Sequence, residues 1–170
     1  MVYYLGIGSN LGERETTMRK AIERLQETGA VEAVAEFVYS APQGFESEHE
    51  FCNTVVKLLS DLQPHELLAR TQTIERQLGR TEHSTLLPDG TKRYADREID
   101  IDLIEAYDNS DSEVIVNTPD LILPHPRMSE RDFVMQPLKE IINSQLWFQT
   151  ERNRSYTKLW SCTCCTGTKM

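Results

Sequence analysis

The strictest hydrophobic pattern in the chain lies at positions 98–104, which read Glu-Ile-Asp-Ile-Asp-Leu-Ile. Acidic and apolar residues alternate there with a period of two, which is typical of a β-strand whose successive side chains point to opposite faces. We therefore expect the alternate apolar residues to enter a core, while Asp100 and Asp102 emerge together on the other face. Their Cα atoms would be roughly 6 to 7 Å apart.

Similar patterns predict the elements around this strand. Short runs rich in β-branched and aromatic residues predict strands at 2–7, 31–39 and 51–59, and a short edge strand at 114–116. A lack of periodicity, together with Pro and Gly, predicts loops at 40–45 and 80–96. The second loop, at about 17 residues, has the length of a functional lid.

Three helices are predicted from apolar residues at helical spacing. The first contains residues 18–25, and the second begins at Pro64 and stops at Gly79. The inward positions of the last helix are expected to be Val134, Leu138, Ile141 and Ile142. The order strand, helix, strand, strand, helix, strand matches a ferredoxin-like, split βαβ sandwich. We predict an α+β fold with a mainly antiparallel sheet and helices packed on one face.

Length and composition limit the number of domains. With 170 residues and 39% hydrophobic content, the chain can bury one substantial core and is too short for two ordinary domains. The expected organisation is one catalytic domain over 1–150 and a polar, reduced C-terminal tail over 151–170 that is a candidate for disorder. The tail contains Cys162, Cys164 and Cys165, but a zinc site would need a second spaced pair of ligands, which the sequence lacks.

The net charge excludes one class of partner. A formal charge of -9 argues against a general nucleic-acid-binding protein, whose phosphate contacts require a basic face. A phosphate-bearing ligand would need a local cluster of basic residues. The sequence has no apolar run near 18 residues and no charged-then-apolar leader, so we expect neither a membrane span nor secretion, and a cytoplasmic location.

The paired aspartates suggest metal chemistry. Two carboxylates on one face of a strand repel each other unless a cation lies between them, and such ligands suit Mg²⁺ that carries substrate phosphates. Arg97, at the start of the strand, fits the same chemistry. The alternative is that the acids form the solvated face of an amphipathic edge strand. A cationic loop at 80–96 beside the strand favours a phosphoryl-transfer site, which needs water excluded and positive charge near the phosphate.

Other places are candidate ligand sites, each with a plainer interpretation. The loop that holds Phe45 and ends near Phe51 and Asn53 is a candidate ligand wall, although a simple hairpin connection explains it equally well. Glu75 lies away from most of the apolar residues of its helix, and ordinary solvent exposure accounts for it. His125 is fixed between two prolines, where it is either structural or able to contact a phosphate or ribose.

Five motifs, in the same order along the chain, resemble the 6-hydroxymethyl-7,8-dihydropterin pyrophosphokinase family of folate biosynthesis. The most specific is Arg97-x-x-Asp100-Ile101-Asp102-Leu103-Ile104. The others are Gly6-Ile7-Gly8-Ser9-Asn10-Leu11, Phe51-x-Asn53, Gln72-x-x-Ile74-Glu75-x-x-x-Gly79-Arg80, and Pro124-His125 with Arg131-x-Phe133. The resemblance extends from Val2 to about Ile142.

The resemblance implies an activity and a set of site residues. The activity is transfer of a pyrophosphoryl group from ATP to the hydroxymethyl group of the pterin, which leaves AMP. Asp100 and Asp102 would hold two Mg²⁺ ions that bridge the triphosphate, and Arg80 and Arg97 would be catalytic residues that stabilise charge on the phosphates. The positions that match nucleotide contacts are Gln72, Glu75, Arg97, Leu103, His125 and Arg131. The positions that match pterin contacts are Gly8, Ser40, Gln43, Phe51, Asn53, Tyr94 and Phe133.

Within the pterin set, the rings of Phe51 and Phe133 would sandwich the flat bicycle and Asn53 would read its edge. Three positions depart from the family pattern. Ser40 stands where threonine is usual, Tyr94 where tryptophan is frequent, and Asp96 where proline is common, so we expect a looser start of the acidic strand.

Two function classes follow from these observations. The first is an ATP- and Mg²⁺-dependent diphosphotransferase whose partners are the small molecules ATP and hydroxymethyl-dihydropterin. Because the P-loop pattern is absent from the sequence, such an enzyme must hold ATP through metal and arginines. The second is a non-catalytic ferredoxin-like binding or regulatory module, in which the acids are only a solvated face.

Overall fold

The structure is a computed structural model that describes residues 1–80, 85–86, 92–93 and 95–144. In chain order the elements are β1 (Val2–Ser9), α1 (Arg14–Leu25), β2 (Ala30–Val34), β3 (Val38–Ser40), β4 (Phe51–Leu59), α2 (Pro64–Gln77), β5 (Thr85–Leu86), β6 (Lys92–Arg93), β7 (Asp100–Tyr107), β8 (Val116–Asn117) and β9 (Ile122–Leu123). A 3₁₀ turn at Met128–Glu130 leads into a last helix over 132–144.

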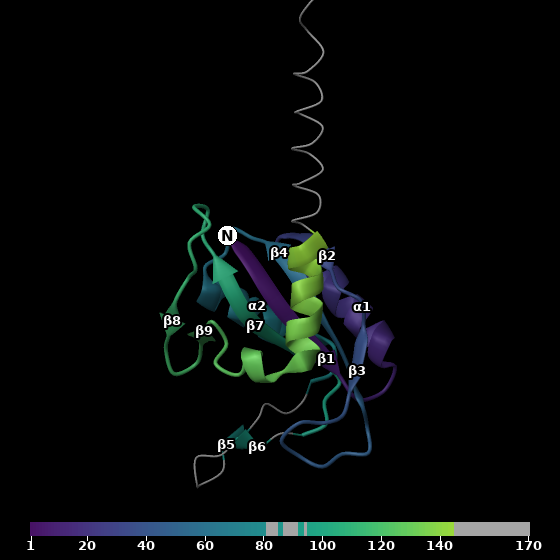
Figure 1. Cartoon of the computed structure of the whole chain (residues 1–170). Coiled ribbons are helices and arrows are strands. Elements are labelled where there is room, and N and C mark those ends of the chain that lie inside the picture. Colours follow the sequence, from purple (N-terminus) through teal and green to yellow (C-terminus); the bar gives the residue numbers. More distant parts are fainter. Residues whose placement is uncertain (81–84, 87–91, 94, 145–170) are drawn as a thin grey trace, which may run out of the picture.

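One antiparallel sheet forms the centre of the molecule (Figure 1). Its strands lie in the order β2-β4-β1-β7, and β3 pairs with another part of β4. The chain connects β1 to β2 through α1 and β4 to β7 through α2. As a result β7, which carries the two aspartates, lies beside β1 at the opposite side of the sheet from β2.

The first face of the sheet is covered by α1 and α2. Tyr3, Leu5 and Ile7 of β1 belong to one buried cluster with Met18 of α1 and Leu67 of α2. The same cluster contains the apolar residues of the alternating segment, Ile99, Ile101 and Leu103, all of which are buried as the period of two predicts. The alternate positions of β7, Asp100 and Asp102, therefore face the other way.

The second face is covered by the last helix, which lies in front of the sheet in Figure 1. Its residues Val134 and Leu138 share a buried cluster with Tyr4, Val55 and Ile104 of the sheet. The prediction of helices on one face is therefore wrong. The physical reason is that β4 is buried along most of its length on both faces, so a single helical layer would leave apolar surface in water.

Several predicted elements have different bounds. Strand β4 and the start of α2 agree with the sequence patterns, but the predicted strand at 31–39 is two strands, β2 and β3, because they pair with different parts of β4. Residues within 80–96 form the short β5–β6 ladder, so the described part of that loop is not structureless. Ile142 is partly exposed instead of inward. The predicted tail at 151–170 lies outside the described residues.

The outer edge of β7 is covered by side chains and loop ends. The Ile101 N–H donates a hydrogen bond to Glu75 Oε1 at 2.6 Å, and the Ile104 carbonyl accepts one from the His125 N–H at 2.7 Å. The Ala106 carbonyl accepts another from the Val114 N–H at 2.8 Å. These contacts fix the strand that carries the aspartates. None of the helices in the described part of the chain is both long and apolar enough to span a membrane.

Candidate active site

Three adjacent strands bring candidate site residues into line across the sheet. Gly8 of β1 lies opposite Asn53 of β4 on one side and opposite Asp100 of β7 on the other. Directly opposed residues in a sheet point to the same face. Asn53 and Asp100 therefore emerge on the face covered by the last helix, and the missing side chain of Gly8 leaves the space between them open.

The neighbouring row repeats this arrangement, with Gly6 of β1 opposite Asp102 of β7. The space above the two glycines is narrow at one end. A Cβ added at Gly8 would lie 2.9 Å from Asn53 Oδ1, whereas one added at Gly6 would lie 3.1 Å from the flexible end of Ile104. Only a glycine at position 8 allows Asn53 to keep its place.

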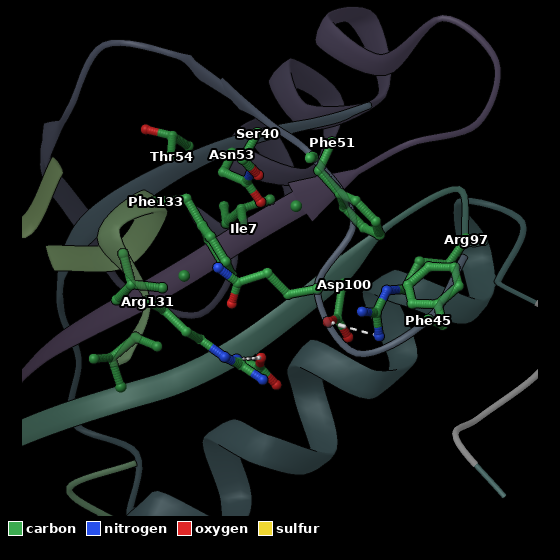
Figure 2. A pocket seen from close by; sticks show the side chains of 17 residues that line it. Ile7, Ser40, Phe45, Phe51, Asn53, Thr54, Arg97, Asp100, Arg131 and Phe133 are labelled. Carbon is green, nitrogen blue, oxygen red and sulfur yellow. Dashed lines mark hydrogen bonds and ion pairs between the residues drawn. The ribbon is translucent and has the colours of Figure 1, made fainter. Parts of the chain in front are cut away.

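A pocket with about 610 Å³ of empty volume, including its open mouth, lies over the glycines (Figure 2). On one side the Asn53 Nδ2 donates a hydrogen bond to Ser40 Oγ at 3.0 Å. Phe51 packs edge-to-face against Phe45, with ring centroids 6.2 Å apart and an interplanar angle of 86°. Phe133, at the start of the last helix, lines the same pocket. This end of the pocket therefore offers aromatic faces and fixed polar groups.

The other end of the pocket is charged. Asp100 accepts hydrogen bonds from Arg97 Nη1 at 3.0 Å and from Arg80 Nη1. Asp102 forms an ion pair with Arg131, with 3.6 Å between Arg131 Nη1 and Asp102 Oδ2. Figure 2 shows Arg97 beside Asp100, with Arg131 on another side of the pocket. In the free protein the two carboxylates are thus neutralised by arginines of the same chain.

Glu75 joins this charged group from α2. Its carboxylate is 3% exposed and accepts hydrogen bonds from the Ile101 N–H and from Arg80 Nη1, the second at 2.6 Å. Burial, and then repulsion from Asp100, raise the pKa of Glu75 to about 7. The interpretation of Glu75 as an ordinary exposed residue is wrong, because its carboxylate is buried and accepts the Ile101 N–H at the free edge of β7.

The same environment shifts two more groups. Partial desolvation in the pocket, and then the neighbouring Asp100, raise the pKa of Asp102, whose side chain is still 42% exposed. Burial alone would lower the pKa of Arg80, but Asp100 and Glu75 outweigh it and hold that pKa above its ordinary value. Crowded carboxylates whose pKa is raised are stabilised by added positive charge, so the site favours a cation.

Two arginine side chains have unused donors. In the described part of the chain, the Nε atoms of Arg97 and Arg131 are buried and have no hydrogen-bond partner. A buried donor without a partner is costly, by about 1–3 kcal/mol. Because both guanidiniums line the pocket, these donors are placed for anionic oxygens of a ligand.

The donor set fits Mg²⁺ in one binding mode. Among the described residues there is no group of three or more His, Cys, Asp or Glu side chains that could hold a metal ion. Mg²⁺ that binds through substrate phosphates needs only one or two carboxylates and keeps several waters. Asp100 and Asp102, on one face of β7 at the pocket, would supply such oxygen ligands if the ion were bound there.

Most of the residues predicted for the site meet in this pocket. The predicted residues that line it are Gly8, Ser40, Gln43, Phe51, Asn53, Arg97, Asp100, Asp102, Arg131 and Phe133. Arg80 and Glu75 do not line the pocket, but Arg80 donates to Asp100 and to Glu75, and Glu75 also accepts from the Ile101 N–H. Tyr94 lies outside the described residues.

Three predicted nucleotide residues lie away from the pocket lining. The side chain of Leu103 is buried on the face of α1 and α2, so only its backbone is available to a ligand from this site. His125 donates its N–H to β7, and its Nδ1 accepts from the Arg127 N–H at 3.2 Å, so it is held in place as expected between two prolines. Gln72 lies on α2 and is partly exposed.

The residues that complete the pocket include several that sequence reasoning left out of the site. Gly6 and Thr54 carry no charge or ring and gave no chemical signal, although the alternation in Gly6-Ile7-Gly8 places both glycines on one face of a strand. Val134 lines the pocket although apolar spacing marked it only as an inward residue, and Ile104, on the same face of β7 as the aspartates, lines it too. Phe45, noted as part of a candidate ligand wall, lines the pocket and contacts Phe51, and its contact with a ligand stays a prediction.

Comparison with known proteins gives one consistent family. The model of the family described as 7,8-dihydro-6-hydroxymethylpterin-pyrophosphokinase matches residues 4–143. A Porphyromonas gingivalis protein named 2-amino-4-hydroxy-6-hydroxymethyldihydropteridine pyrophosphokinase is 43% identical over 143 residues, which is 82% of this chain and 90% of that protein. A Bacillus subtilis protein of the same name is 38% identical and covers 82% of this chain and 77% of its own length.

A third relative is part of a longer protein. It is a Dictyostelium discoideum folic acid synthesis protein, 37% identical over 140 residues, which cover 82% of this chain and 19% of that protein. The range matched by the family model, residues 4–143, includes most of β1, all of β4 and β7 and the start of the last helix, which all contribute residues to the pocket.

Proposed function

The chain belongs to the 7,8-dihydro-6-hydroxymethylpterin-pyrophosphokinase family, and from that premise we propose how its residues divide the work. The enzyme is a diphosphotransferase of folate synthesis that moves pyrophosphate from ATP to 6-hydroxymethyl-7,8-dihydropterin. The hydroxymethyl oxygen loses its proton and bonds to the β-phosphorus, the bond between that phosphorus and the oxygen that bridges it to the α-phosphorus breaks, and AMP leaves with that oxygen. The alternative of a non-catalytic module is not favoured, because relatives over most of the chain are named as pyrophosphokinases.

The main support for dividing the pocket into a pterin end and a triphosphate end is that Asn53, Gly8 and Asp100 lie opposite one another on adjacent strands. Asn53 and the phenylalanines hold the pterin at one end of the pocket, and the aspartates hold the triphosphate end through two Mg²⁺ ions. When bound, these ions offset phosphate charge and align the β-phosphorus. Gly8 keeps the path between the two ends open.

The arginines exchange partners in this proposal. In the free protein Arg97 and Arg80 neutralise Asp100, and Arg131 neutralises Asp102. If Asp100 and Asp102 held metal, the guanidiniums would be free to donate to phosphate oxygens, including through the unused Nε atoms of Arg97 and Arg131. The charge balance of the pocket is preserved as metal and triphosphate enter together.

The pterin end is built from few polar groups. Asn53 Oδ1 and the backbone near Gly8 and Gln43 read the edge of the bicycle, and the Ser40 hydroxyl fixes the orientation of the Asn53 amide. Phe51 and Phe133 stack on the two faces of the bicycle. Tyr94 remains a predicted pterin contact, and Gln72, Glu75, Leu103 and His125 remain predicted nucleotide contacts.

We also propose that the α+β fold is of the ferredoxin-like type. The order β2-β4-β1-β7 with helical connections after β1 and β4 supports a ferredoxin-like sandwich with one extra helix on the second face. The cytoplasmic location, the absence of nucleic-acid partners and the single-domain division at residue 150 stay predictions.

The activity is tested by incubating the protein with ATP, Mg²⁺ and 6-hydroxymethyl-7,8-dihydropterin and separating the nucleotides. We expect AMP to appear only when the pterin is present, in equal amount to the pterin diphosphate, and activity to disappear when EDTA removes the metal. Release of ADP, or no nucleotide product, would contradict the proposal.

Gly8→Ala should weaken pterin binding selectively. The added Cβ would lie 2.9 Å from Asn53 Oδ1, so the amide that reads the pterin must move. We expect the KM for the pterin to rise about tenfold or more, because a displaced polar group leaves the ligand unpaired, while the dissociation constant for ATP changes less than twofold.

Gly6→Ala is the matched control, since it adds the same methyl group two residues away on the same face. Its Cβ meets only the mobile end of Ile104 at 3.1 Å, and we expect a change in pterin KM of less than threefold. Equal effects of the two substitutions, measured by steady-state kinetics and calorimetry, would count against the assigned place of the pterin.

A further inference from the structure

Arg97 is held at the start of β7 by its backbone. Asn10, which follows β1, accepts a hydrogen bond from the Arg97 N–H on its Oδ1 at 2.8 Å, and the Asn10 N–H donates to the Arg97 carbonyl at 3.2 Å. Asn10 is 2% exposed. Both the N–H and the carbonyl of Arg97 are therefore held by Asn10. This fixes the backbone from which the guanidinium extends to Asp100.

Asp96, the residue before Arg97, adds a side-chain link to the same point. Its Oδ1 accepts a hydrogen bond from Asn10 Nδ2 at 2.6 Å, and its carboxylate also accepts one from the Ser47 hydroxyl. Hydrogen bonds from Ser47 and then Asn10 hold the pKa of Asp96 below its ordinary value, with a smaller contribution from His49. The expected looser start of the strand stays a prediction, and the hydrogen bond between Asn10 and Asp96 opposes such loosening.

The loop at 41–50 is connected to Arg97 through these contacts. Ser47 reaches Asp96, and the His49 carbonyl accepts a further hydrogen bond from Asn10 Nδ2 at 3.4 Å. The same loop carries Gln43 and Phe45 at the pterin end of the pocket. One carboxylate thus bridges a segment that contacts the acceptor and a segment that contacts the phosphates.

We propose that Asp96, acting with Asn10, is a positioning residue that couples the pterin-binding loop at 41–50 to the placement of Arg97. The inference rests on the proposed function. Asp96 itself does not line the pocket, and its effect on the reaction passes through Arg97 and through the loop. Because two hydrogen bonds to an exposed carboxylate also lend ordinary local stability, the test must separate positioning from stability.

The first measurement is the steady-state kinetics of Asp96→Ala, with AMP release as the signal. We expect kcat to fall about three- to tenfold and the pterin KM to rise about three- to tenfold, because small displacements of a charged group from its reacting partner are costly. The KM for ATP should change less than twofold. Pterin binding measured by calorimetry, without ATP, should weaken by the same factor as the KM rises.

Asp96→Asn is the conservative variant, since an amide oxygen still accepts from Asn10 and Ser47. It should recover at least half of the wild-type kcat. The matched control is Asp108→Ala, which removes another exposed carboxylate that accepts hydrogen bonds from Ser110 and Ser112 in a turn distant from the pocket. Asp108→Ala should leave kcat and both KM values unchanged even if it lowers the melting temperature as much as Asp96→Ala does.

The decisive arm is Asp96→Ala in an Arg97→Ala background. If Asp96 acts through Arg97, the kcat of the double variant should be less than twofold below that of Arg97→Ala alone. Unchanged kinetics of Asp96→Ala, or the same loss of kcat with and without Arg97, would overturn the coupling while the wild-type enzyme still releases AMP. A wild-type enzyme that releases no AMP would overturn the proposed function and this inference with it.

Discussion

Asp100→Ala and Asp102→Ala are each expected to lower kcat by about a thousandfold or more while the protein stays folded. Each carboxylate faces the pocket from β7, and in the proposed mechanism its removal takes away an oxygen ligand for the ions that would neutralise the triphosphate. A loss of about 4 kcal/mol of transition-state stabilisation corresponds to this factor, because each 1.36 kcal/mol is tenfold in rate. The measurement is AMP release at saturating ATP and pterin over a range of Mg²⁺ concentrations.

The fold should survive both changes. The apolar side chains that seat β7 are on its opposite face, and Arg80 keeps Glu75 as a partner when Asp100 is removed. Glu98→Ala is the matched control, because Glu98 is the remaining acid of the alternating segment and does not line the pocket. It should keep activity within about twofold. Retained activity in either aspartate variant, with a normal melting temperature, would count against the metal assignment.

Arg97→Ala is expected to slow the chemical step by about a hundred- to a thousandfold with little change in the KM for either substrate. The guanidinium is partly buried, pairs with Asp100 at 3.0 Å and has a free Nε donor. A group that stabilises charge mainly as the bond to the leaving group breaks affects kcat and kcat/KM equally. Single-turnover kinetics, with enzyme in excess, isolate that step.

A control arginine separates the local effect from net charge. Arg76→Ala removes an exposed arginine of α2 whose Nη2 donates to Thr73, and it should leave the single-turnover rate unchanged. If the loss in Arg97→Ala appeared only as a raised KM, the residue would be a binding group and not a stabiliser of developing charge.

The sequence patterns predict the central sheet because its strands have unambiguous periods. The alternation at 98–104 correctly places three apolar residues in the core, and the apolar run at 51–59 gives β4 its observed bounds. The split of 31–39 into β2 and β3 could not be predicted, because it depends on which part of β4 each half meets. The position of the last helix on the second face is likewise a property of packing.

The site residues that could be predicted are those whose side chains are chemically distinctive and belong to a sequence motif. The aspartates, Arg97, Asn53 and the phenylalanines have charge, amide or ring character, and the structure brings them together. The structural tasks of Glu75 and Asn10 depend on backbone groups that lie far away in sequence, Ile101 and Arg97. Local sequence carries no signal for such partners.

The row of residues across β4, β1 and β7 has a consequence for which alcohols the enzyme accepts. Asn53 and Asp100 are two strand spacings apart, roughly 10 Å, and this separation is set by backbone hydrogen bonds that a side-chain rotation cannot alter. The fixed separation therefore limits the length of the acceptor. In an alcohol lengthened by one methylene, the hydroxyl oxygen would lie about 1.5 Å beyond the point of attack. In this proposal, selection by the length of the acceptor is made by the sheet, whereas the loop at 41–50 contributes contacts to the ring.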